Sequence, residues 1–231
     1  MDKVVSKSHG VLTNVSMILG FVSSPVFRQI LPIQRVSFNV SERSDRLIVR
    51  NLAQTKLIAD GGFWDFTADM SRNDLAYSAE GLPAHTDTTY FTDPAGLQIF
   101  HLLSHEGKGG RTLLLDAFYT ANLLSTLYPT SYSLLSRLRI PFHASGHTGT
   151  LLRPIISQPI LRHDDSGQLV QVRWNNEDRG VLGARWRPEE VRGWYQAARR
   201  FEDLCKGDDA EYWVQLSPGT VVGEWSSSDH R

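Results

Sequence analysis

The chain has 231 residues, 41% of them hydrophobic, and its 24 basic against 25 acidic residues leave a formal net charge of −1. The basic residues are spread along the chain, which excludes the positive field that a nucleic acid partner requires. The single cysteine, Cys205, excludes an internal disulfide and a cysteine-based zinc cluster, and no stretch reaches the ~20 apolar residues of a membrane span.

Residues 1–58 form an N-terminal segment whose structure the sequence does not define. The first fifty residues hold many Ser and Arg and few acidic residues, a composition that loosely fits a mitochondrial transit segment. An ordinary strand-rich region with exposed charges is the alternative, and residues 36–49 would suit an exposed strand and turn. Gly61-Gly62 then marks a break, after which the pattern becomes regular.

Two strands are predicted after the aromatic segment that begins at Phe63. Residues 97–103 alternate between apolar and polar side chains, and residues 111–115 are a second strand candidate. Glycine-rich residues 107–110 separate them, so we predict an antiparallel hairpin.

Helices and further strands are predicted in the second half. Residues 117–138 have leucines at helical spacing, with Pro129 as a break between two short helices. Residues 169–174 alternate as a strand, residues 188–204 begin with proline and continue as a long helix, and residues 212–222 return to strand character. Strands that pair locally around one long helix favour an antiparallel β architecture.

His85-Thr86-Asp87 is the motif with the clearest chemical meaning. On an extended backbone, residues i and i+2 project to the same face, so the imidazole and the carboxylate could reach one cation. Joined by a distant second histidine, they would make the facial triad that holds Fe(II). A surface histidine beside a carboxylate in a turn is the alternative reading of so short a motif.

Longer runs around this motif carry a resemblance. They are AHTDTTYF at 84–91, GLQIFH at 96–101, GGRTLLLDAF at 109–118, GGFWDFTAD at 61–69 and RWNN at 173–176. Together they resemble the trimethyllysine and γ-butyrobetaine dioxygenases, which are taurine dioxygenase-like oxygenases. The resemblance implies a mainly β fold with flanking helices, the double-stranded β-helix or jelly roll. It also implies Fe(II), 2-oxoglutarate and O₂, with ascorbate compatible as a reductant, and hydroxylation of N6,N6,N6-trimethyllysine, the first step of carnitine biosynthesis.

The resemblance also implies roles for individual residues. His85 and Asp87 match the first two metal ligands, and Thr112 matches a position that binds the far carboxylate of 2-oxoglutarate. The residues that match the substrate site are Trp64 and Tyr77 as walls of a cage for the quaternary ammonium group, Asp74 close by, and Asn175 and Asn176 as donors to the amino-acid end. Core packing is the alternative role for each aromatic residue.

The two ends depart from the family pattern. The family places its second metal histidine four residues after a tryptophan and follows it with an arginine that binds 2-oxoglutarate. Here Asp229 stands four residues after Trp225, and His230 comes one place late, so His230 is the predicted third ligand with Asp229 as its alternative. Asp60 stands where the family has a tyrosine of the cage. We therefore expect a dioxygenase domain over residues 59–231 that is incomplete at its C-terminal end.

Three functions stay open on this sequence. The first is a trimethyllysine hydroxylase, whose activity in this chain the altered ends leave undecided. The second is a catalytically inactive isoform that binds trimethylammonium groups without iron. The third is a γ-butyrobetaine hydroxylase. For each function we expect a small-molecule ligand and neither nucleic acid nor membrane as a partner. A homodimer is compatible with all three, and the expected location is the mitochondrion or the cytoplasm.

Overall fold

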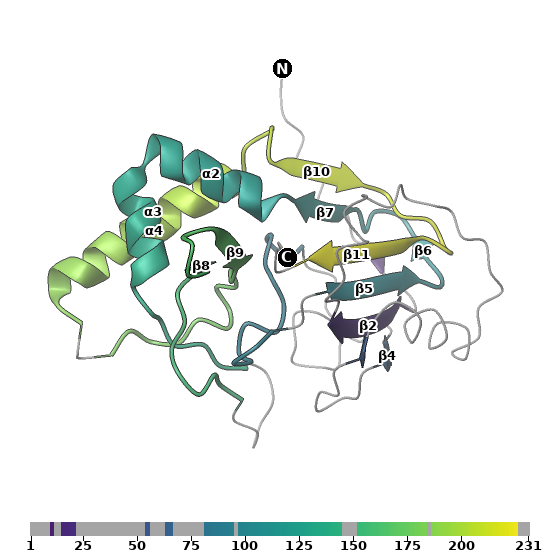
Figure 1. Ribbon diagram of the computed structural model, residues 1–231. Coiled ribbons are helices and arrows are strands. Elements are labelled where there is room, and N and C mark those ends of the chain that lie inside the picture. The colour runs from purple at the N-terminus through teal and green to yellow at the C-terminus, as the bar shows by residue number, and fades with distance from the viewer. Residues whose placement is uncertain are drawn as a thin grey trace. The chain divides into compact units, whose positions relative to one another are not determined.

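The computed structural model describes residues 10–11, 15–21, 54–55, 63–66, 81–94, 97–144, 152–183 and 186–225 (Figure 1). The predicted strand at 36–49 lies outside these ranges. The elements follow one another as β1 (Gly10–Val11), β2 (Val15–Phe21), β3 (Gln54–Thr55), β4 (Phe63–Phe66), β5 (Leu97–Leu102), β6 (Glu106–Gly107), β7 (Thr112–Leu115), α2 (Ala117–Leu127), α3 (Pro129–Arg137), β8 (Leu161–His163), β9 (Leu169–Val172), α4 (Pro188–Cys205), β10 (Glu211–Val214) and β11 (Val221–Trp225).

The chain divides into two compact units. The first takes residues up to 83 with 97–112 and 213–224, and the second takes 84–96, 113–212 and the residues from 225. The predicted domain boundary between residues 58 and 59 lies outside the described residues and stays a prediction.

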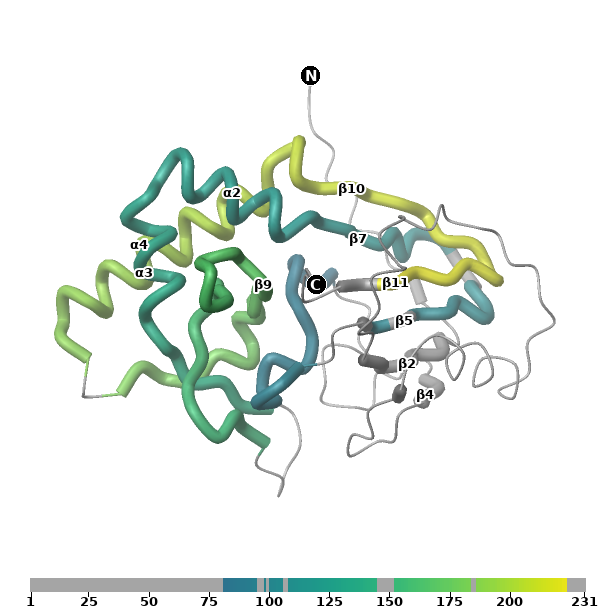
Figure 2. The backbone as a smooth tube through the Cα atoms, in the orientation of Figure 1, coloured from purple at the N-terminus to yellow at the C-terminus, as the bar shows by residue number. Residues whose placement is uncertain are grey.

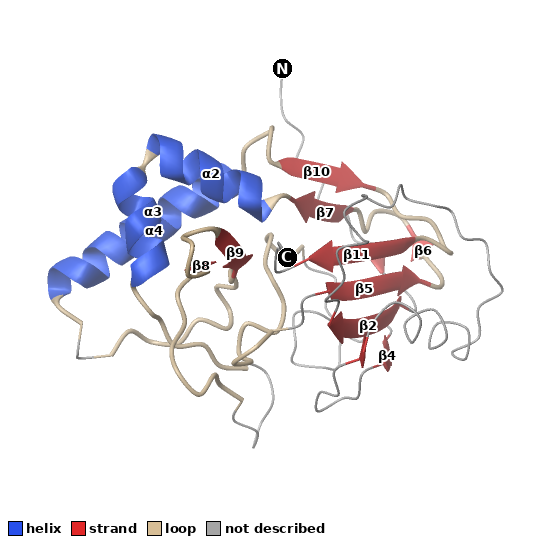
Figure 3. Cartoon of the chain, viewed as in Figure 1, coloured by secondary structure: helices blue, strands red, loops and turns tan. Residues whose placement is uncertain are grey.

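The first unit is built on a five-stranded sheet with β2 at its centre (Figure 3). β5 runs antiparallel to β2 on one side, with Val15 opposite Leu102, and β3 and β4 pair antiparallel with β2 on the other. β11 lies beyond β5, and β1 pairs separately with β6. The sheet therefore joins segments that are far apart in the sequence.

The predicted hairpin between residues 97–103 and 111–115 is wrong, although both strands exist. β5 has β2 on one edge and β11 on the other, so it has no edge left for β7, which pairs with β10 instead. Between the strands, Gly109 and Gly110 have φ of 92° and 66°, a left-handed conformation that glycine adopts without steric cost. Gly107 ends β6, Lys108 is a bend and Gly109 and Gly110 lie in a loop, so the glycine-rich segment does not close a hairpin but leads the chain to a different partner.

The second unit contains the helices and the β8–β9 hairpin. Pro129 is the first residue of α3, which separates α2 from α3 as the sequence predicts. The Asp116 carboxylate caps α2 by accepting hydrogen bonds from the backbone N–H groups of Phe118 (3.0 Å) and Tyr119 (2.9 Å). The predicted helix at 188–204 is confirmed as α4, and Pro188 is its first residue.

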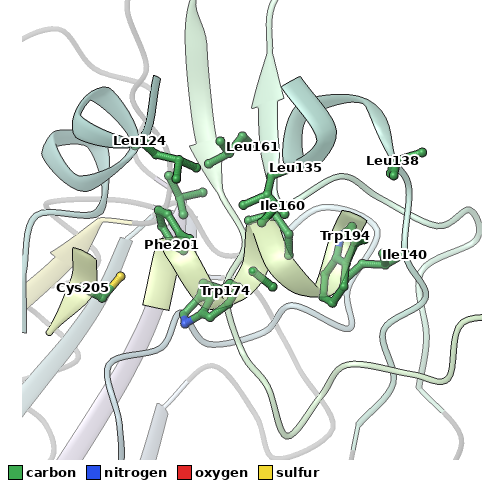
Figure 4. Packing of buried hydrophobic residues seen from close by; sticks show 14 of the residues in the cluster. Leu124, Leu135, Leu138, Ile140, Ile160, Leu161, Trp174, Trp194, Phe201 and Cys205 are labelled. Carbon is green, nitrogen blue, oxygen red and sulfur yellow. The ribbon is translucent and has the colours of Figure 1, made fainter. Parts of the chain in front are cut away.

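The core of the second unit lies where the three helices meet β8 and β9 (Figure 4). Trp194, Ala197 and Phe201 give α4 a fully buried face, and Leu124 and Leu135 come from α2 and α3. The ring of Trp174 meets Phe201 edge-on, with centroids 5.0 Å apart. Burying side chains of this size stabilises the fold by about 1.5–3 kcal/mol each before other costs are counted.

The described part of the chain thus consists mostly of small antiparallel sheets with flanking helices, the coarse fold class that the sequence predicts. Within the ranges listed above, the strands do not close into a barrel. In the same part of the chain, no helix combines the length and the apolar character that crossing a bilayer would require.

Candidate metal centre

His85 and Asp87 lie side by side in the second unit. Nε2 of His85 is 3.2 Å from Oδ1 of Asp87, and the two side chains are 31% and 33% exposed. They belong to a loop rather than to a strand, and the residue between them, Thr86, is buried, at 8% exposed. The i and i+2 spacing therefore brings the imidazole and the carboxylate together at the surface.

Thr86 holds this local geometry by hydrogen bonds to Trp174. Figure 2 draws the backbone of the two segments that contain these residues, 81–94 and 152–183. The Thr86 N–H donates to the Trp174 carbonyl at 2.6 Å, and the Trp174 N–H donates to the Thr86 hydroxyl oxygen at 2.8 Å. Both residues are buried, so these bonds replace contacts with water that neither group can make. The backbone between the two candidate ligands is thereby tied to the end of the β8–β9 hairpin.

The chain after Asp87 is anchored a second time. Thr89 is fully buried, and its hydroxyl donates to Oδ2 of Asp178 at 2.5 Å. The guanidinium of Arg173 donates to the carbonyl oxygens of Thr89 (2.9 Å), Phe91 (2.7 Å) and Thr92 (3.3 Å). We refer to residues 85–92 as the metal loop, because they carry the candidate ligands and these anchors.

Arg173 is 2% exposed, so its environment is set by neighbouring dipoles and charges. Burial lowers the pKa of its guanidinium to about 10, and the charge of Arg162 acts in the same direction while Asp93 opposes it. With that pKa the group stays protonated at neutral pH. Its positive charge faces the negative ends of three loop carbonyls, which is a favourable arrangement in a site that excludes water.

Asn175 and Asn176, the predicted substrate donors, follow Trp174 directly. Oδ1 of Asn175 accepts hydrogen bonds from the backbone N–H groups of Glu177 (2.9 Å) and Asp178 (3.3 Å) and so closes a local turn. The Asn176 side chain is exposed. A substrate role for Asn175 would therefore have to use its amide nitrogen, because the oxygen already serves the fold.

The other predicted site residues are described less fully. Thr112 is half-buried at the first position of β7, and Trp64 lies on β4 opposite Met17 in the ladder with β2. Asp74, Tyr77 and His230 lie outside the described residues, as do Asp60 and Asp229. The roles of all these residues stay predictions.

The donor atoms of His85 and Asp87 fit one divalent ion. Two ligands bound at 90° to an octahedral ion at about 2.1 Å would be about 3.0 Å apart, close to the observed 3.2 Å. An imidazole nitrogen and a carboxylate oxygen are two of the three donors of the facial triad for Fe(II). Among the described residues, no group of three His, Cys, Asp or Glu side chains could hold a metal ion.

The sequence interpretation missed the residues that hold the metal loop, namely Thr86, Thr89, Arg173 and Asp178. One signal for Arg173 was present. It follows the alternating run Leu169–Val172. A charged side chain that is buried next to a strand almost always has hydrogen-bonding or charged partners. The partners of the two threonines depend on contacts over more than 80 residues, which no local pattern contains.

The described part of the site is an imidazole–carboxylate pair on a firmly anchored loop, a donor pair that metal-dependent oxygenases also use. Residues 40–223 match the Taurine catabolism dioxygenase TauD, TfdA family. The chain belongs to this family.

Individual relatives give a finer comparison. The chain is 45% identical over 162 residues to a trimethyllysine dioxygenase of Meyerozyma guilliermondii, a match covering 70% of this chain and 41% of the relative. It is 40% identical over 164 residues to a mitochondrial trimethyllysine dioxygenase of Rattus norvegicus, covering 70% and 39%. A gamma-butyrobetaine dioxygenase of Homo sapiens is 26% identical over 162 residues, covering 70% and 42%. The matched region thus spans about two fifths of the length of these relatives.

Proposed function

We propose that this chain carries the iron-binding part of a 2-oxoglutarate-dependent dioxygenase that hydroxylates N6,N6,N6-trimethyllysine. The observation that carries the proposal is the His85–Asp87 pair, whose donor atoms lie 3.2 Å apart on a loop anchored by buried residues, in a chain of the TauD, TfdA family. Residues 59–231 would form the dioxygenase domain. Its fold would be a double-stranded β-helix, a proposal supported by the antiparallel sheets described above.

His85 and Asp87 would hold the ferrous ion, with His230 as the proposed third ligand. When bound, Fe(II) would supply the activation of O₂ coupled to the oxidation of 2-oxoglutarate, with ascorbate as the proposed reductant. Thr112 would donate a hydrogen bond to the far carboxylate of 2-oxoglutarate. Each of these groups positions a reactant and leaves the redox chemistry to the metal.

The substrate side is proposed from the chemistry of the trimethylated cation. A quaternary ammonium group cannot donate hydrogen bonds, so the rings of Trp64 and Tyr77 would bind it by cation–π attraction worth about 0.5–2 kcal/mol each. Asp74 would add a negative charge. The amide nitrogens of Asn175 and Asn176 would donate to the carboxylate at the amino-acid end.

Trimethyllysine is preferred over γ-butyrobetaine on the identities of the relatives. Proteins named for trimethyllysine are 40% and 45% identical to this chain, against 26% for the one named for γ-butyrobetaine. The name of the rat relative supports a mitochondrial location over a cytoplasmic one.

The test is succinate release by the purified chain with Fe(II), 2-oxoglutarate and O₂. We expect succinate to form with trimethyllysine, more slowly with γ-butyrobetaine, and at background without either. Asp87→Ala should abolish the reaction and the binding of Mn(II), a redox-stable ion that accepts the same nitrogen and oxygen donors. Asp165→Ala, an exposed aspartate of the β8–β9 turn, is the matched control and should change neither.

Two results would separate the alternatives. Calorimetric binding of trimethyllysine in the presence of a chelator, without succinate release, would support a binding module in place of an enzyme. Mn(II) binding that survives in Asp87→Ala would contradict the proposed metal site.

A further inference from the structure

The metal loop contains a strained turn directly after the second candidate ligand. Thr88 has φ of 55°, in the left-handed region, and is 5% exposed. For a β-branched residue this conformation is sterically unfavourable. The turn closes by a hydrogen bond from the Phe91 N–H to the Thr88 carbonyl at 3.0 Å. Strain of this kind persists only where surrounding contacts hold it.

Arg173 supplies those contacts from beneath the turn. Nη1 donates to the carbonyl oxygens of Thr89 and Phe91. Nη2 donates to the carbonyl oxygen of Thr92 and, at 3.2 Å, to the side-chain oxygen Oε1 of Gln171. One planar guanidinium thus donates hydrogen bonds to three carbonyl oxygens of the turn and to one side chain of β9. A lysine would keep the charge but would replace this rigid fork with a single ammonium on a flexible stem.

The same stretch of chain holds both sides of the ligand pair. Trp174, the residue after Arg173, binds Thr86 between the two ligands, and Arg173 binds the turn that follows Asp87. Because these anchors are adjacent in sequence, a shift of Arg173 would move the turn relative to Thr86. The carboxylate of Asp87 lies between the two anchored points.

We propose that Arg173 is the positioning residue of the metal centre. By gathering the carbonyls of the strained turn, it sets the orientation of the Asp87 carboxylate towards His85 and thereby the affinity for the metal ion. This inference rests on the proposed function, since it assumes that the pair binds a metal. Arg173 is 2% exposed and would act on the ion through the turn, not by direct contact.

The test compares Arg173→Lys with Arg200→Lys. Arg200 is a matched control in the same unit: its Nη1 donates to Ser131 at 3.0 Å and its guanidinium lies 4.6 Å from the centroid of the Tyr128 ring, where it joins helices and does not contact the metal loop. Loss of a residue that orients metal ligands weakens metal affinity roughly 10- to 100-fold. We expect Arg173→Lys to raise the Mn(II) dissociation constant, followed by electron paramagnetic resonance, by such a factor, and Arg200→Lys to leave it unchanged.

A second variant and a metal-free measurement guard against misfolding. Gln171→Met removes one acceptor of Arg173 without touching the loop and should raise the dissociation constant several-fold. Hydrogen exchange without metal should show faster exchange of the Phe91 amide in Arg173→Lys but not in Arg200→Lys.

The outcomes for this inference and for the proposed function differ. If wild-type protein does not bind Mn(II), the proposed function fails, and the metal role of Arg173 fails with it. If the wild type binds Mn(II) and folded Arg173→Lys and Gln171→Met bind it equally well, the inference alone is overturned. Unchanged exchange of the Phe91 amide in Arg173→Lys would also overturn it.

Discussion

Thr86 and Trp174 are joined by reciprocal hydrogen bonds across 88 residues of sequence, since each donates its backbone N–H to an oxygen of the other. One of these bonds uses the side-chain hydroxyl of Thr86, so the link depends on the threonine side chain between His85 and Asp87. Its importance can be tested by changing one atom of Thr86.

Thr86→Val should destabilise the protein and weaken metal binding together. Valine has nearly the shape of threonine but cannot accept the Trp174 N–H, which would stay buried without a partner at a cost of about 1–3 kcal/mol. Thr86→Ser keeps the hydroxyl and should stay close to wild type in metal affinity. Urea unfolding and Mn(II) titration check both variants, and equal metal affinity in Thr86→Val and Thr86→Ser would contradict this reading.

Asn175→Asp separates the two roles assigned to Asn175. Aspartate keeps the oxygen that accepts from Glu177 and Asp178 but loses the amide that would donate to the substrate. We expect the unfolding midpoint to change little and the affinity for trimethyllysine to fall at least tenfold, because a carboxylate would then face the carboxylate of the substrate. Calorimetry measures the affinity, and an unchanged value would remove Asn175 from the substrate site.

Cys205 should give the stability a dependence on alkaline pH. Burial, with a smaller contribution from Glu202, raises the pKa of its thiol from 9.0 to about 12. The unfolded chain therefore loses this proton first, so the contribution is complete below about pH 9 and is lost as the pH rises towards 12, at no more than about 1.4 kcal/mol per pH unit. Urea unfolding at pH 8 and pH 10.5 should show a steeper decline for the wild type than for Cys205→Ala. Parallel declines would contradict the shifted pKa.

Phe201→Ala should bring the fold close to its limit of stability. Phe201 is fully buried and packs edge-on against Trp174, and such a truncation costs about 3–5 kcal/mol. Natural domains have only about 5–15 kcal/mol in total. Gln196→Ala, an exposed change on the same helix, is the control and should cost less than 1 kcal/mol. Urea unfolding of both variants measures the difference.

Local elements could be predicted because their signals are local. Pro129 and Pro188 mark helix starts, and the alternation of residues 97–103 marks a strand, which the structure has as β5. The i and i+2 rule also anticipated that His85 and Asp87 would lie together. Each of these features follows from a few neighbouring residues.

Strand partners could not be predicted in the same way. The hairpin between residues 97–103 and 111–115 was the natural expectation from a glycine-rich turn, yet β5 lies between β2 and β11. Likewise, nothing near Thr89 indicates Asp178, and nothing near Phe91 indicates Arg173. Pairings of this kind are decided by packing of the whole unit, which adjacent residues do not encode.

The anchors of the metal loop also have a consequence for the order of assembly on the ribosome. The ribosome adds Thr92 to the chain 81 residues before Arg173, and Thr89 89 residues before Asp178. Since translation adds about 5–20 residues per second, His85 and Asp87 spend several seconds in a nascent chain without the contacts that align them. If the pair binds iron as proposed, iron captured earlier than that would meet two unaligned side chains, and loading of the site would be a late event in the making of this protein.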